Sequence, residues 1–147
     1  MRRHVRGLRR CNRGTSVIET AIIVPVLALL FGSGVDASLG FAQKYRDQQA
    51  ADRAVQFAMD AGLTTATQTT VQAEATASSG LPASDISVNF WLECNGVVQP
   101  SFSGVCATGL PARYLSVTVT DSYTPAFSRL LYSQSIPLQG FAEGRVQ

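Results

Sequence analysis

Two cysteines in the second half of the chain are the clearest pair of reactive side chains in this sequence. Cys94 and Cys106 flank the turn-rich segment NGVVQPSFSGV, whereas the third cysteine, Cys11, lies near the N-terminus. An even pair in an exported region favours a disulfide, and two free thiols are the alternative. Closing a loop of this size would stabilise the fold by about 3 kcal/mol. Cys11 would remain cytoplasmic and reduced.

Glu19 is the second residue in an unusual setting, because it lies at the start of an apolar run. A carboxylate in hydrocarbon costs a few kcal/mol on insertion scales and usually marks function. Gly14 follows Arg13 and lies five residues before Glu19. Cleavage between Gly14 and Thr15 would create an α-amine with a reference pKa of about 7.7, which would be largely protonated. Glu19 could instead stabilise the N-terminus of a helix by about 0.3–1 kcal/mol.

Residues for catalysis or metal binding are scarce. The single histidine, His4, precedes the apolar run, which excludes histidine-dependent nucleophilic catalysis and histidine metal sites from the rest of the chain. No glycine-rich phosphate loop is present, since Gly32 and Gly34 lie within the apolar run and suit helix packing. The remaining carboxylates have the sequence contexts of ordinary surface charges; examples are Asp85, Glu93, Asp121 and Glu143. We expect no enzyme active site, no cofactor and no metal.

The first 14 residues form a basic leader that runs directly into the apolar segment. Six of the 12 basic residues precede Thr15, and the rest of the chain has six basic and ten acidic residues, a net charge of −4. This order is typical of insertion into a membrane with the basic end in the cytoplasm. We therefore expect a leader over 1–14, a transmembrane segment over 15–36 and an exported remainder. A nucleic-acid-binding arm is disfavoured because the apolar run follows immediately.

Three kinds of signal could produce this arrangement. An ordinary secretory signal would be cut near Val35-Asp36-Ala37, but an acidic residue at the start of its apolar region does not suit it. An uncleaved signal anchor is the second possibility. A prepilin-type leader is the third, and it is favoured by Gly14 and Glu19, since such leaders are cut on the cytoplasmic side and leave the apolar run attached.

One long helix is predicted from Thr15 to Gly62, with Pro25 tolerated inside the membrane. Its exported part, residues 37–62, is amphipathic and is expected to pack on its own domain. Helix-like spacing predicts that its apolar face comprises Phe41, Tyr45, Ala51, Ala54, Val55, Ala58 and Ala61.

Residues 63–147 are predicted to form a small exported α+β domain. A short helix is expected around Val71–Ala75, ended by Gly80 and Pro82. Alternating apolar residues predict strands at 86–93 and 115–120, and a final strand at 136–142 interrupted by Gly140 and Gly144. The fold class is therefore α+β, a long N-terminal helix on a small antiparallel sheet.

The segment RGTSVIETAIIVPVLALLFGSGVDASLGFAQKYRDQQAADRAVQFA resembles the N-terminal signature of the TadE-like family, minor pseudopilins of the tight-adherence (Flp-type) pilus system. The matching features are the basic leader, Val17, Glu19, Pro25 and the Gln- and Ala-rich run 48–52. The Val-x-Val strand and the tyrosine-threonine-proline turn near the C-terminus also fit the arrangement.

This resemblance implies a pilin-like structural part rather than an enzyme. It implies cleavage between Gly14 and Thr15 by a prepilin peptidase and an assembly role for Glu19. The partners would be other pilins or pseudopilins and the pilus assembly machinery, with no nucleic acid. The chain would lie in the bacterial inner membrane with its C-terminal domain in the periplasm, or in a surface pilus. The alternative is an uncleaved, signal-anchored periplasmic scaffold or binding protein.

Overall fold

A computed structural model describes residues 13–62, 67–127, 129 and 134–146. Two α-helices, a 3-10 turn and four strands follow one another along the chain: α1 (Arg13–Ala61), α2 (Gln68–Ser79), η1 (Ala83–Asp85), β1 (Ile86–Cys94), β2 (Val97–Gln99), β3 (Pro111–Tyr123) and β4 (Ile136–Val146). The predicted long helix and the α+β class are confirmed. Residues 1–12 of the leader, with His4 and Cys11, lie outside the described part.

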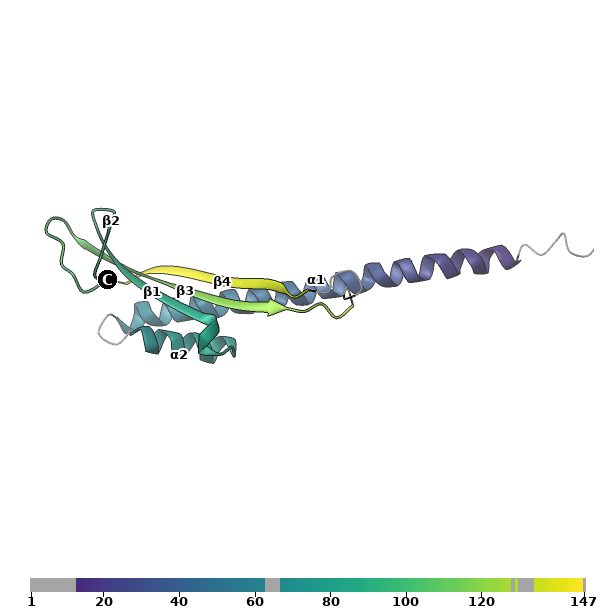
Figure 1. Cartoon of the computed structure of the whole chain (residues 1–147), viewed down its shortest axis with the longest axis horizontal. Helices are drawn as coiled ribbons and strands as arrows, with labels where there is room; N and C mark the ends of the chain where they lie inside the picture. The colour runs from purple at the N-terminus through teal and green to yellow at the C-terminus, as the bar shows by residue number, and fades with distance from the viewer. Residues whose placement is uncertain (1–12, 63–66, 128, 130–133, 147) are drawn as a thin grey trace, which may run out of the picture.

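The four strands form one antiparallel sheet in the order β2-β1-β3-β4. The sheet lies along the C-terminal half of α1, and the N-terminal half projects beyond the domain (Figure 1). Helix α2 packs beside α1 and β1. It is longer than the predicted 71–75, because Thr67 caps its first turn and Gly80, at φ 75°, ends it in the left-handed conformation.

The face of α1 that meets the sheet is made of small and polar residues. Asp36, Gly40, Gln43 and Asp47 follow one another at spacings of three and four, and the stripe continues through Ala50, Ala51, Ala54 and Ala58. Phe41 and Tyr45 were predicted for this face, but they are 73% and 65% exposed. The prediction was wrong there because it ranked residues by apolarity, whereas small side chains allow the strands to approach the helix.

Gly140 and Gly144 do not interrupt the last strand, which corrects the prediction from sequence. β4 is continuous, and Gly140 pairs with Val119 while Gly144 pairs with Leu115. A side chain at Gly140 would overlap the backbone of Asp47, and one at Gly144 would meet Val55. Both glycines are therefore the points where β4 crosses α1 at closest approach.

Glutamine side chains cover both edges of the sheet. The amide of Gln48 on α1 donates to the carbonyl of Phe141 (2.7 Å) and accepts from its N–H (3.2 Å), so it pairs with β4 as a neighbouring strand would. On the other edge, Gln68 donates to Val88 O and Gln72 donates to Ile86 O. Unpaired strand edges favour association with other chains, so these amides help to keep the sheet closed.

The end of the sheet farthest from the projecting helix carries two cysteines. Cys94 and Cys106 form a disulfide with Cα atoms 5.6 Å apart, as predicted. The loop between them contains β2, a short strand that the alternation analysis missed. β2 pairs with β1 only from Leu92 to Cys94.

The approach at Gly140 gives a first prediction. Gly140→Ala should lower the stability of the full chain in detergent by about 1–3 kcal/mol, because backbone cannot move aside as a flexible side chain can. The melting temperature, followed by circular dichroism, should fall by several degrees. Gly34→Ala is the matched control, since nothing lies within 4 Å of the added methyl group. Equal melting temperatures for Gly140→Ala and wild type would contradict the close approach.

Candidate functional site

The N-terminal half of α1 is apolar, and no other element covers it in the described part of the chain. From Val17 to Phe31 every side chain is exposed; Leu30 is 63% and Phe31 75% exposed. In the described residues, one helix is long and apolar enough to cross a membrane, and only 6% of its most apolar 18-residue window is buried. A core helix of a soluble domain would be mostly covered. The twenty residues from Val17 to Asp36 correspond to about 30 Å of helix, which matches the hydrocarbon thickness of a bilayer.

The residues predicted for processing and assembly lie at the far end of this uncovered segment. Gly14 and Thr15 fall in the first turn of α1, and Glu19 is one further turn along the same helix with an exposed side chain. The sheet lies along a later part of α1 (Figure 1). Cleavage at Gly14 and pairing of Glu19 with a neighbour stay predictions.

Asp36 is the residue where the uncovered segment meets the domain. The residue is 4% exposed, and its carboxylate accepts hydrogen bonds from the last residue of β3 and from the loop after it. Oδ1 accepts from the N–H of Ala126 at 2.9 Å and the hydroxyl of Tyr123 at 3.3 Å, and Oδ2 accepts from the N–H of Phe127 at 2.9 Å. A buried carboxylate with charge-assisted bonds of this kind fixes the loop to the helix.

Glycines let the same loop lie close to α1. A methyl group at Gly32 would be 2.9 Å from Cβ of Phe127, and one at Gly40 would be 3.3 Å from the ring of Tyr123. Burial of the Tyr123 hydroxyl, followed by the negative charge of Asp36 and the hydrogen bond to it, raises the pKa of Tyr123. Tyr123 is therefore a neutral donor at physiological pH. Gly34 has no such neighbour.

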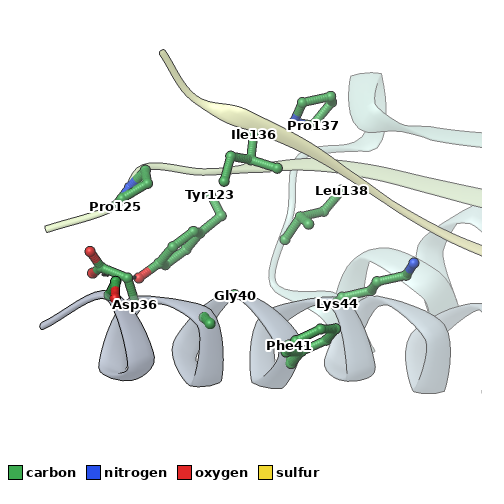
Figure 2. A pocket seen from close by; sticks show the side chains of 11 residues that line it. Asp36, Gly40, Phe41, Lys44, Tyr123, Pro125, Ile136, Pro137 and Leu138 are labelled. Carbon is green, nitrogen blue, oxygen red and sulfur yellow. Dashed lines mark hydrogen bonds between the residues drawn. The ribbon is translucent and has the colours of Figure 1, made fainter. Parts of the chain in front are cut away.

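Next to this contact is a hollow of about 480 Å³ between α1 and the ends of β3 and β4 (Figure 2). Its lining is mostly apolar and includes Phe41, Pro125, Ile136, Pro137 and Leu138. Figure 2 shows the Asp36 carboxylate at one end, turned toward the Tyr123 hydroxyl, and the ammonium of Lys44 at the other.

A second buried carboxylate lies farther along α1. Asp47 is 3% exposed, and its Oδ2 has no hydrogen-bond partner among the described residues. Burial, with a smaller contribution from the negative charge of Asp121, raises the pKa of Asp47. Asp121 itself accepts a hydrogen bond from Gln43, which lies one turn before Asp47. The Asp47 carboxylate lies on the stripe of α1 that meets the sheet, where its charged form is disfavoured.

Hydrogen bonds of Asp36 and Gln43 join α1 to the end of β3 and to the loop that follows it. Within the described ranges, no three His, Cys, Asp or Glu side chains gather in a way that could hold a metal ion. Cys94 of the disulfide pairs with the first residue of β3, whereas Asp36 binds the loop after its last residue, so the two lie at opposite ends of the strand. No family model, curated protein or solved structure matches this chain.

Sequence reasoning missed both buried aspartates. Asp36 was treated as the end of the transmembrane segment and as part of an alternative signal-peptidase site, and Asp47 was given no role. One signal was present for Asp36, because it is the first charged residue after the apolar run. For Asp47 the only signal was its place at heptad-like spacing from Asp36, Gly40 and Gln43.

The raised pKa of Asp47 predicts how stability depends on pH. The folded state holds the Asp47 proton more tightly than the unfolded state, so stability falls as the pH rises from about the ordinary value of 3.8 through the raised pKa. Asp47→Asn should therefore melt a few degrees higher than wild type at neutral pH. The gain should vanish as the pH is lowered toward 3.8.

Thermal unfolding of both proteins across this pH range is the measurement. Asp60→Asn, an exposed position on the same helix, should leave the profile unchanged. A lower melting temperature for Asp47→Asn at neutral pH would show that the charged carboxylate stabilises the fold.

Proposed function

We propose that this chain is a minor pseudopilin-like subunit, a structural part of a tight-adherence (Flp-type) pilus system. The observation that carries the proposal is a single helix with two environments. Its N-terminal half is apolar and uncovered, and the sheet packs on its C-terminal half. A subunit of this shape can be stored in a membrane and later exchange lipid for the helices of other subunits.

Glu19 supplies the specificity of that exchange in this proposal. Its side chain is exposed on the uncovered segment of α1. After cleavage at Gly14, the protonated amine of Thr15 on an incoming subunit would be the complementary charge. In the absence of such a partner a carboxylate near hydrocarbon is unfavourable, so pairing would favour assembly.

Processing of the leader gives the first test of this function. In cells with the pilus system, the mature protein should begin at Thr15, and intact mass or N-terminal sequencing should show it. Gly14→Val should leave only full-length protein in membranes, whereas Gly7→Val, within the leader, should be cut normally. A mature N-terminus near Ser38 would indicate ordinary signal peptidase. A full-length wild type would indicate a signal-anchored scaffold or binding protein.

The charge of Glu19 gives the second test. Glu19→Gln should insert into membranes at least as well as wild type, since it removes a charge that is costly in lipid while keeping the shape. Filaments should nevertheless be lost, because the amine of Thr15 would face apolar surroundings without a counter-charge.

Glu143→Gln is the matched control, since Glu143 is an exposed carboxylate on β4. Piliation and surface adherence are the readouts, with protein level and cleavage checked by blotting. If Glu19 only stabilises the helix terminus, the loss would be about 0.3–1 kcal/mol and filaments would form normally. Normal filaments at normal protein levels would contradict the assembly role.

A further inference from the structure

The hollow beside Asp36 has a lining and a position that point to a lipid. We propose that it seats one phospholipid from the leaflet on the domain side of the membrane. The phosphate would lie beside Lys44, and the glycerol with the carbonyl end of an acyl chain would lie against Phe41, Ile136 and Leu138. This inference rests on insertion of α1 into a membrane, which is part of the proposed function, but it does not depend on pilus assembly.

Depth along α1 places the hollow at the membrane surface. If residues 17–36 cross the hydrocarbon, the lining begins at Ser33, about 5 Å inside its edge, and reaches Lys44, about 12 Å outside it. The headgroup zone on each side of a bilayer is about 5–8 Å thick. The end of the hollow near Asp36 thus meets acyl chains, and the lysine end lies just above the phosphates. The flexible stem of Lys44 can bring its ammonium down to them.

The chemistry of the lining agrees with this orientation. Its walls near the hydrocarbon edge are aromatic, aliphatic and proline side chains, and Phe41 and Ile136 are large apolar residues that stay exposed in the isolated chain. The volume of about 480 Å³ falls within the range of about 300–1,000 Å³ typical of small-molecule sites. An exposed apolar hollow costs free energy in water but not against lipid.

The charges that face the hollow favour a phosphate. The Asp36 carboxylate is engaged by Tyr123 and by two backbone amides at one end. Lys44 has no hydrogen-bond or carboxylate partner within the part of the chain that the structure describes, and it lies two turns of helix away from Asp36. A second copy inserted in the same membrane would present its own Lys44 at the same depth. The two ammonium groups would repel each other, which disfavours a second copy as the occupant of the hollow. A phosphodiester supplies the opposite charge.

Photocrosslinking tests the assignment. The full-length chain is reconstituted in vesicles that contain phosphatidylglycerol with a diazirine near the carbonyl end of one acyl chain. After irradiation, mass spectrometry should find lipid adducts on the segments around Phe41 and Pro137, besides those on the apolar half of α1. Lys44→Gln should reduce the adducts at the hollow about five-fold, and Ile136→Trp, which fills it, should reduce them at least as much. Arg46→Gln, an exposed cation outside the hollow, should not.

Each other outcome overturns the assignment in a distinguishable way. Adducts confined to residues 17–34 would show that α1 is inserted but the hollow is empty. Protein–protein crosslinks at Phe41 would show that a second copy occupies it. Adducts that persist in both variants would show contact with bulk lipid only. The absence of adducts everywhere would contradict membrane insertion itself, and with it the proposed function.

Discussion

The hydrogen bonds of Asp36 fix the relation between the two halves of the molecule. One carboxylate on α1 accepts from residues that lie about 90 positions later in the chain, at the point where the helix leaves the domain. The loop after the end of β3 has backbone N–H groups without ladder partners, and these groups need acceptors. Asp36 satisfies two of these groups from the helix itself. The uncovered half of α1 therefore extends from the domain in one fixed direction.

Close approach of the sheet to the helix continues from that point outward. Beyond Asp36, the stripe of α1 that meets the sheet consists of glycine, glutamine, aspartate and alanine. On β4, Gly140 and Gly144 lie against this helix. At this distance the side-chain amide of Gln48 on α1 binds both the N–H and the C=O of Phe141, as a neighbouring strand would. Helix α1 contributes Ala50, Ala51, Ala54, Val55 and Ala58 to the same core as the sheet and α2. The domain and the apolar segment thus share one helix, as the proposed role in a filament requires.

Patterns of apolar residues predicted much of this fold from the sequence. The extent of α1, the strands around Val88 and Val117 and the disulfide all follow from spacing and composition. Spacing failed where small or polar residues make the contact. Phe41 and Tyr45 were placed on the buried face because they are apolar, and Gly140 was taken as a break because glycine usually weakens a strand. Asp36 and Asp47 gave no signal by composition, since their importance depends on which loop or strand folds over them.

Asp36 holds the loop after β3 onto α1 at the point where the helix leaves the domain. Amide hydrogen exchange of the full chain in nanodiscs tests it directly, with resonances of Ala126 and Phe127 followed by NMR. In Asp36→Ala both amides should exchange roughly ten-fold faster or more, because each loses its acceptor. In Asp36→Asn one of the two should remain protected, since the side chain keeps a single acceptor oxygen, and Asp60→Asn should change neither. Unchanged protection of both amides in Asp36→Ala would contradict the account.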